Sequence, residues 1–326
     1  MNSFVQRVDS VLAVTLPNTA FSRSHPGLQI AWDSTSMGAF KECPRKYYYT
    51  IICGYQPRQQ SVHLTFGLHY HKALEAYDHA KAQGCDHKQA MCVAVKLAMM
   101  LTWDKTTGRP WLSDDKYKNR LTFLRSIVWY LDSFENDPMQ TVILANGKPA
   151  VELSFRFETS HMSPEGHPYL WCGHLDRVAE MNNQTFILDR KTSKNEINED
   201  YFKQFSPNNQ MSGYDFAGQV GYKLPIQGIV IDAAQILITG TRFKRGMVSR
   251  TDEQRNEWMQ DLGYYFHQAE HMAKECYWPM NDKSCGNYGG CPFRMICGKS
   301  PVVRDGWLES AFYKRVWDPL IVRGDI

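Results

Sequence analysis

The chain has 326 residues with a formal net charge of +3, and 43% of them are hydrophobic, enough to bury one large core or two modest ones. Its 22% charged and 13% aromatic residues exclude a disordered chain, while the small net charge neither requires nor excludes a nucleic-acid partner. No apolar run approaches the roughly 18 residues of a membrane helix, and the N-terminus lacks a secretory signal pattern. We therefore expect a cytoplasmic protein with no membrane partner and with reduced cysteines.

The N-terminal part of the chain is predicted to be mainly helical. Residues 1–30 show no strong periodicity and are predicted to form an arm, followed by a helical region at 31–145. Ser34–Ser36 precede an apolar and aromatic helix, which Pro44 is expected to kink or break. Gly84 is expected to end the next helix. The further predicted helices are residues 66–83, 86–104 and 116–134.

The pattern changes near Pro149 to that of an α/β core, predicted at residues 146–275. Residues 151–157 alternate between apolar and polar side chains, which predicts a half-buried strand. A hairpin of two strands follows, and Thr251–Gln254 form a capping box. The predicted order is helix, three strands, helix, strand. The later elements are a helix at 208–223, a strand at 233–241, a helix to about 275, a cysteine-rich region at 276–300 and a packed tail at 301–326.

The hairpin carries the strongest candidate for a site. Its strands are predicted at Trp171–Met181 and Thr185–Lys191, joined by a turn at Asn182 and Asn183. Side chains alternate along a strand, so Asp189 and Lys191 project from one face, and Asp176 of the first strand can meet them. An isolated Asp–Lys pair is commonly a surface ion pair. Here, however, Asp189 follows an apolar run, where a carboxylate is costly unless it is paired or binds metal.

Two helical pairs are further candidates. His71 and Glu75 lie four residues apart on one helix face, with His63 and His69 as rival ligands. Gln210 and Tyr214 are also four apart, although on its own this pair is best interpreted as a polar residue beside a packed tyrosine.

Cysteines near the C-terminus form the last candidate. Cys285, Cys291 and Cys297 recur at intervals of six within a Gly-rich segment that can wrap a small metal centre. A fourth thiolate is needed, and Cys276 and Cys43 are both open as that ligand. Four thiolates suit zinc or an iron–sulfur cluster.

Together these segments resemble the RecB-like branch of the PD-(D/E)XK nuclease superfamily, which includes CRISPR-associated RecB-like exonucleases, the AddB nuclease domain and phage-encoded relatives. The likeness runs in family order over roughly residues 32–298. The matching segments are SxS-xxx-F-xx-CPRKYYY at Ser34–Tyr49, G-xxx-H at Gly67–His71, GHLDRV at Gly173–Val178, LDRKTS at Leu188–Ser193, Q-xxx-Y at Gln210–Tyr214 and the C-terminal cysteines. The resemblance implies an α/β restriction-endonuclease-like core of order α-β-β-β-α-β in a bacterial, archaeal or phage-infected cell.

The resemblance also implies roles for the candidate residues. His71, Asp176 and Asp189 would bind Mg²⁺ or Mn²⁺, and Lys191 would position or deprotonate the attacking water. Additional roles are implied for a larger set: Gln210 and Tyr214 contacting DNA or orienting the site, Glu152 as an accessory acid, and Arg45, Lys46 and Arg190 contacting DNA. The tyrosines at 47–49 could stack on bases, with packing in the core as the alternative.

A 4Fe–4S cluster is likewise implied, with Cys43 joining Cys285, Cys291 and Cys297 and so connecting the N- and C-terminal segments. One departure matters, because the family usually has two residues between its second and third cysteines and this chain has five. Zinc and a role for Cys276 therefore stay open.

We thus expect a metal-dependent DNA nuclease, most simply an exonuclease acting on single strands or duplex ends. A non-catalytic DNA- or protein-binding module is one alternative, although such modules usually lose the hairpin Asp or Lys that this chain keeps. Another is a nuclease subunit in recombination, CRISPR adaptation or phage genome processing, with a helicase or integrase as partner.

Overall fold

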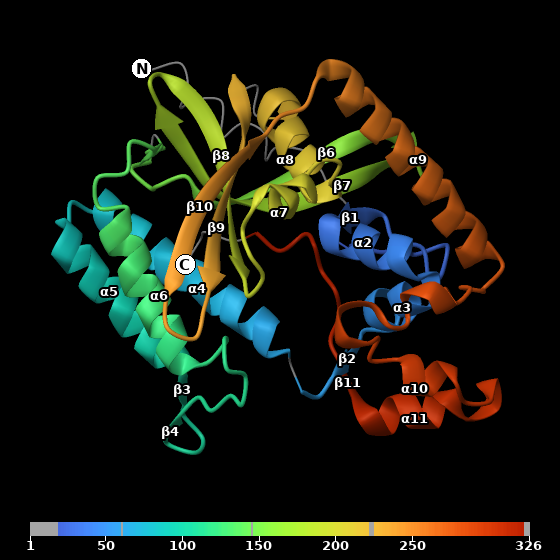
Figure 1. The fold of residues 1–326 in the computed structure, drawn as a ribbon. Helices are drawn as coiled ribbons and strands as arrows, with labels where there is room; N and C mark the ends of the chain where they lie inside the picture. Colours follow the sequence, from blue (N-terminus) through green and yellow to red (C-terminus); the bar gives the residue numbers. More distant parts are fainter. Residues whose placement is uncertain (1–18, 60, 145, 222–224, 323–326) are drawn as a thin grey trace.

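A computed structural model describes residues 19–59, 61–144, 146–221 and 225–322. Within these ranges, one mixed sheet of seven strands forms the centre of the molecule (Figure 1). Its main path is β1-β7-β8-β9-β10, and β5 and β6 also pair with β7. The strands are β1 (Ala31–Asp33), β5 (Gln140–Thr141), β6 (Val151–Met162), β7 (Pro168–Met181), β8 (Gln184–Ser193), β9 (Ile226–Ile236) and β10 (Thr241–Val248). No helix in the described ranges is long and apolar enough to span a membrane.

The predicted hairpin is present as β7 and β8. Asn182 and Asn183 have φ values of 51° and 61°, the left-handed conformation that a two-residue hairpin turn requires. Their short polar side chains tolerate it, which explains why the turn falls at this dipeptide. The ladder then runs from Met181 and Gln184 to Arg177 and Leu188.

Beyond that short ladder the sheet forks. The earlier part of β7 pairs with β6 on one side and with β1 on the other. Strand β8 pairs in parallel with β9 along its length, from Thr185 to Ser193, and beyond Leu188 it no longer pairs with β7. Asp176 and Asp189 are therefore the first residues past the point where β7 and β8 separate. The fork places polar side chains at an opening between two buried strands.

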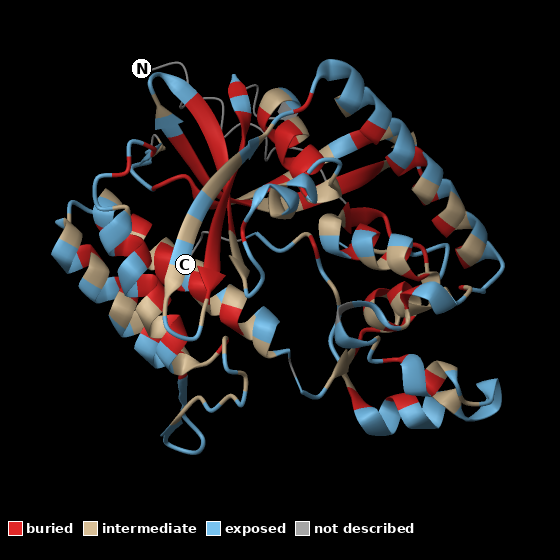
Figure 2. Ribbon diagram, viewed as in Figure 1, coloured by how far each residue is buried: buried red, intermediate tan, exposed pale blue. Residues whose placement is uncertain are grey.

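Helices cover both faces of the sheet (Figures 1 and 2). On one side lie α4 (Val62–Ala82), α5 (His87–Leu101) and α6 (Arg120–Ser133), packed on the end of β9. On the other side lie α2 (Ser34–Glu42), α8 (Asn209–Phe216) and α9 (Asp252–Lys274), which share the larger core with β7 and β8. The predicted helices are thus present with shifted ends, and their buried sides face the sheet (Figure 2).

Local signals set several of these ends. Gly84, with φ of 87°, follows the last turn of α4 as the predicted stop. Thr251 and Gln254 form the predicted capping box of α9. Pro44 ends α2 and begins the short α3 (Pro44–Tyr47), which continues as a π-helical segment over Tyr48–Ile52.

The second half of the core differs from prediction in two places. The helix expected at 208–223 ends as α8 at Phe216 and continues as a π-helical segment over Ala217–Gly221; residues 222–224 lie outside the described ranges. The strand expected at 233–241 runs instead as β9 over Ile226–Ile236, because the chain turns where Leu237 N–H bonds the carbonyl of Gly240. It returns as β10, a strand that the sequence did not predict.

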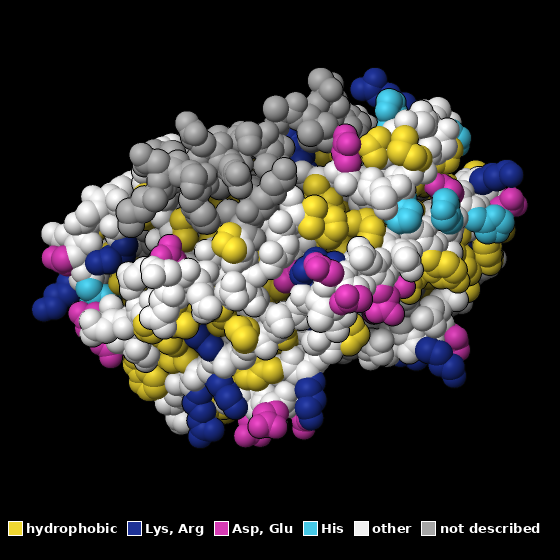
Figure 3. All heavy atoms as spheres, turned by 90° about the horizontal axis from the view of Figure 1, so that it is seen from above, with side chains coloured by type: hydrophobic (Ala, Val, Ile, Leu, Met, Phe, Trp, Pro, Cys, Tyr) yellow, Lys and Arg dark blue, Asp and Glu magenta, His cyan; other side chains and the backbone are white. Residues whose placement is uncertain are grey.

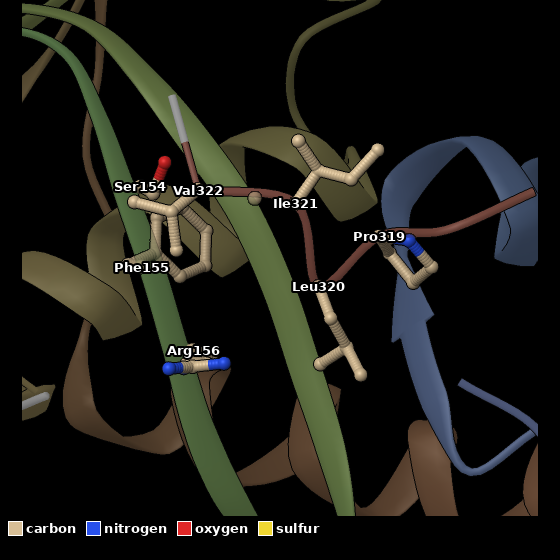
Figure 4. Close-up of a pocket in the computed structure, with 8 residues that line it drawn as sticks. Ser154, Phe155, Arg156, Pro319, Leu320, Ile321 and Val322 are labelled. Carbon is tan, nitrogen blue, oxygen red and sulfur yellow. The ribbon is translucent and has the colours of Figure 1, made fainter. Parts of the chain in front are cut away.

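The C-terminal part packs beside α3. Strand β11 (Phe312–Lys314) pairs with β2 (Tyr55–Pro57), and Leu308 and Phe312 join Tyr49 in a small apolar cluster. Residues 319–322 then cross β6 and β7 beside Ser154 and Arg156 (Figure 4). The remaining elements are β3 (Trp103–Asp104), β4 (Arg109–Pro110), α7 (Glu199–Lys203), α10 (Arg294–Cys297), α11 (Arg304–Ala311) and 3₁₀ turns at Asp282–Ser284, Asn287–Gly289 and Pro301–Val303.

Candidate functional site

Two carboxylates face each other across the fork. Asp176 Oδ2 accepts a 2.8 Å hydrogen bond from the backbone N–H of Arg190 and lies 3.3 Å from His71 Nδ1 of α4. The Asp189 side chain is fully buried and lies 2.7–2.9 Å from Lys191 Nζ. The hairpin register thus brings together the three residues that the sequence predicted, and α4 adds His71.

A third carboxylate lies at the same place. One donor atom each from His71, Glu152 and Asp176 fall within 4.8 Å of one another. Glu152 begins β6 with φ of 51°, a strained left-handed conformation for a residue other than glycine. Such strain is held only where the surrounding structure enforces it, and it clusters at functional sites. The arrangement brings Glu152, weighed from sequence as an accessory acid, into one group of candidate metal ligands with His71 and Asp176.

The donor set fits a hard divalent cation. Carboxylate oxygens suit Mg²⁺ and Mn²⁺, and an imidazole is compatible with Mn²⁺. Both oxygens of Asp189 lie within 2.9 Å of Lys191 Nζ, so the ammonium compensates the charge of this buried carboxylate at the fork. The residues at this site therefore fit the metal that the sequence resemblance implies.

The pKa values of the two aspartates are shifted in opposite directions. Burial opposes the charge on Asp176, but the adjacent His71 outweighs it and lowers the pKa of Asp176 to about 2. Burial dominates for Asp189 and raises its pKa to about 6, although Lys191 acts against the rise. Burial also opposes the charge on His71, yet Asp176 raises the pKa of this imidazole. An ionised carboxylate thus lies beside one that takes up a proton near neutral pH, a pattern found at functional sites.

Lys191 is held by a chain of hydrogen bonds that leads into α8. Its Nζ donates to Gln210 Oε1 at 3.0 Å, and Gln210 Nε2 donates to Tyr214 Oη at 2.8 Å. Gly213 lets α8 approach the sheet closely, because a Cβ there would lie 2.4 Å from the indole nitrogen of Trp171. The glycine that weakens the helix in isolation is thus required by packing, and the Gln210–Tyr214 pair lies at the fork.

The structure places Arg190 elsewhere than expected. Its side chain is buried and forms a 2.7 Å ion pair with Asp78 of α4, on the opposite face of β8 from Lys191. A buried guanidinium paired in this way cannot reach a DNA backbone. The expectation that Arg190 contacts DNA is therefore corrected to a structural link between β8 and α4.

The basic and aromatic segment after Cys43 is largely packed. Tyr47 and Tyr49 are buried, and Tyr47 stacks on Trp32. Arg45 Nε donates to the carbonyl of Trp278, and Lys46 pairs with Glu42 at 2.6 Å. The core alternative holds for these two tyrosines, while Arg45 and Lys46 keep part of their surface exposed.

The four cysteines of the implied cluster come from both ends of the chain to one region. Cys43 is buried, and its Sγ accepts the backbone N–H of Asn281 at 3.3 Å. Burial raises the pKa of Cys291, and the nearby Cys43 and Cys285 raise it further. Cys297 behaves likewise, with Cys291 and Cys43 as contributing neighbours. Cys276 is exposed, and its Sγ contacts the carbonyl of Ala273.

One residue beside the site had no sequence signal. Tyr201 of α7 lies near Asp189; burial and then the charge of Asp189 raise its pKa to about 12. The rival histidines have other partners than the carboxylates at the fork. His63 faces Asp115 at 3.7 Å, and the His69 ring meets Phe123 of α6 edge-on.

Figure 3 shows basic and acidic side chains interspersed on the coloured part of one outer face, in keeping with the small net charge. The net charge thus indicates no function, and the candidate functional side chains of the described chain lie at the fork.

Comparison with known proteins gives one family. The family model described as the PD-(D/E)XK nuclease superfamily matches residues 34–298. Among solved structures, a candidate exonuclease from Eubacterium rectale is similar, with 11% identity, a TM-score of 0.46, and coverage of 88% of this chain and 99% of that chain. The protein SSO0001 shows 10% identity, a TM-score of 0.34, and coverage of 90% and 92%. No curated protein matches.

Proposed function

Because this chain belongs to the PD-(D/E)XK nuclease superfamily, we propose that it is a metal-dependent deoxyribonuclease of the RecB-like branch that degrades DNA from an end. The observation that carries this proposal is the meeting of His71, Asp176, Asp189 and Lys191 at the fork of the sheet. These side chains come from α4, β7 and β8, so only the folded chain assembles them.

His71, Glu152, Asp176 and Asp189 would hold Mg²⁺ or Mn²⁺. The bound cation would lower the pKa of a coordinated water and offset negative charge on the phosphate. Asp176 is the residue best prepared for this role, since its pKa of about 2 keeps it ionised. His71 and the backbone N–H of Arg190 both contact its Oδ2 and so fix its orientation.

Lys191 supplies the protein's own positive charge at the reacting phosphate. Its side chain is 27% exposed, so it is reachable by substrate, while Asp189 and Gln210 fix its ammonium. A cation held in this way orients an attacking water and stabilises charge that develops on the phosphate oxygens without reorganising during the reaction. Tyr214 acts one step further back by holding Gln210.

The exonuclease assignment rests on the six ordered motifs shared with the RecB-like branch. DNA would be the substrate as a single strand or as duplex ends, and a helicase, integrase or recombination partner would supply it if the chain works within a complex.

We further propose that Cys43, Cys285, Cys291 and Cys297 bind a 4Fe–4S cluster. The proposal is supported by the contact of Cys43 Sγ with the backbone N–H of Asn281, four residues before Cys285. A zinc ion bound by the same four thiolates is the alternative.

The test is digestion of DNA labelled at one end, single- or double-stranded, with Mg²⁺ or Mn²⁺, by wild type and Lys191→Ala. We expect metal-dependent release of label from wild type and a loss of about 10²-fold or more in the variant, the scale of removing one preorganised charge-stabilising group. The order of label release gives the polarity.

Two outcomes would contradict the proposal. Equal activity of both proteins would mean that Lys191 is not in the active site. Binding of DNA without cleavage by metal-loaded wild type would indicate a non-catalytic binding module instead.

A further inference from the structure

A lysine far from the hairpin in sequence touches both elements that carry the site. Lys118 lies in the loop before α6 and is only 3% exposed. Its Nζ donates to Thr192 Oγ1 at 2.7 Å and to the Thr192 carbonyl at 3.3 Å. The same ammonium lies 4.9 Å from the ring centroid of Phe66 in α4. Lys118 thus joins the end of β8 to the helix that carries His71.

The contact falls directly beside Lys191. Side chains alternate along β8, so Arg190 and Thr192 face α4 while Lys191 between them faces α8. Arg190 is fixed by Asp78, and Thr192 is fixed by Lys118. The strand is therefore anchored on both sides of Lys191.

The anchor is an unusual one for a structural role. In the described part of the chain, the Lys118 ammonium forms no ion pair with a carboxylate, and its hydrogen bonds go to Thr192. Asp115 of the same loop accepts the backbone N–H of Lys118 rather than its ammonium, and also faces His63. Burying an ammonium without a counter-ion costs free energy. A packed apolar side chain would serve the fold better.

The lowered pKa of Lys118 is consistent with the free-energy cost of burying its ammonium. Burial lowers the pKa of Lys118 to about 8, Asp115 acts against the decrease, and Lys194 beyond the end of β8 adds to it. The folded protein therefore disfavours the charged lysine that it nevertheless carries at neutral pH.

We propose that Lys118 is a positioning residue for the nuclease reaction, which holds the end of β8 against α4 so that Lys191 and His71 keep their relative placement. This inference rests on the proposed function. It assigns Lys118 no contact with DNA, because its ammonium is buried against Thr192 and Phe66.

The test compares Lys118→Met, Thr192→Val and the double variant in the full-length, metal-loaded protein. We expect kcat to fall about tenfold in each single variant, with the KM for DNA changed less than about twofold. Because the two residues act as one unit, the double variant should lose no more than the larger single loss. Lys116→Met is the matched control, since Lys116 is exposed in the same loop and the substitution makes the same change in charge.

The Tm measured by thermal unfolding distinguishes a positioning role of Lys118 from a merely structural one. Removing the buried ammonium should leave the Tm of Lys118→Met at or above that of wild type while kcat falls. A decrease of Tm together with kcat would overturn the inference in favour of a structural role. A raised KM at unchanged kcat would overturn it in favour of a DNA contact.

The inference and the proposed function can fail separately. If wild type cleaves DNA, Lys191→Ala does not, and Lys118→Met retains full kcat, only the role of Lys118 is wrong. If wild type cleaves no DNA with either metal, the proposed function fails and takes this role with it.

Discussion

The raised pKa of Asp189 shows the free-energy cost of burying a carboxylate at the site. It is fully buried, and its pKa of about 6 exceeds the ordinary value of 3.8 because burial disfavours the carboxylate. A raised pKa means that the folded state holds the proton more tightly than the unfolded state. The stability that this provides is present at low pH and is lost as the pH rises from about 4 to about 6.

Asp189→Asn should therefore stabilise the metal-free protein while it abolishes cleavage. Between pH 7 and 8 in a chelator, we expect its free energy of unfolding to exceed that of wild type by about 1–3 kcal/mol, since each pKa unit corresponds to about 1.4 kcal/mol. The difference should vanish below about pH 4, where both folded forms are neutral at this position. Chemical denaturation across this pH range measures it. A variant less stable than wild type at pH 8 would show that the charge of Asp189 is fully compensated by Lys191.

At this scale the sequence predicts only what lies close along the chain or follows from alternation. Asp189 and Lys191 share a face because they are two residues apart on a strand. Their match to Asp176 follows from a turn that the Asn pair fixes. Glu152 lies beside His71 and Asp176 although it is distant from both in sequence, and Lys118 contacts Thr192 across 74 residues. Neither has a local pattern in the sequence.

The ion pair between Arg190 and Asp78 connects two elements of the fold, because it fixes α4 on β8. Both side chains are buried, and the Nη2–Oδ2 distance is 2.7 Å. Removing one partner leaves the other charge buried without compensation, which typically costs about 3–5 kcal/mol. We expect Arg190→Leu to lose about that much stability.

The double variant Arg190→Leu with Asp78→Leu provides the decisive comparison. With no charge left unpaired, its loss should be smaller than that of Arg190→Leu alone. Arg242→Leu, an exposed arginine on β10, should change stability by less than about 0.5 kcal/mol. Urea unfolding of the four proteins measures these differences. Unchanged stability in Arg190→Leu with weakened DNA binding would restore the role as a DNA contact.

The helices of the core were predictable because the residues that begin or end them can be recognised in the sequence. Thr251 and Gln254 cap α9, and Gly84 ends α4. By contrast β10 alternates weakly, and the turn at 237–240 interrupts what the sequence presents as one apolar run. The fork itself, which creates the site, is a property of pairing between distant strands and has no signature in any one of them.

For the whole molecule, the two ends of the family match meet beside α3. The backbone N–H of Arg45 bonds the carbonyl of Pro279, and Asn281 Nδ2 bonds the carbonyl of Glu42. Asn281 also donates its backbone N–H to Cys43 Sγ. The closure of a loop of this length is thus made by hydrogen bonds already, and a cluster would add covalent links to the same place.

The family resemblance predicts that a metal cluster connects these two segments, and it left the fourth ligand open between Cys43 and Cys276. The contacts favour Cys43, since its Sγ accepts the backbone N–H of Asn281 beside the C-terminal cysteine region. Cys276 has a φ of 51° and directs its Sγ to a carbonyl of its own turn.

Cys43→Ser should therefore lose the cluster and the long-range link together. Anaerobically purified wild type should be brown and contain iron, whereas Cys43→Ser should be colourless, with a Tm lower by several degrees, because the link between the two ends is lost. Cys53→Ser is the matched control, since Cys53 is a partly buried cysteine on the neighbouring apolar cluster.

Iron retained in Cys43→Ser but lost in Cys276→Ser would reassign the fourth ligand. Colourless wild type with stoichiometric zinc would replace the iron–sulfur cluster by a zinc site.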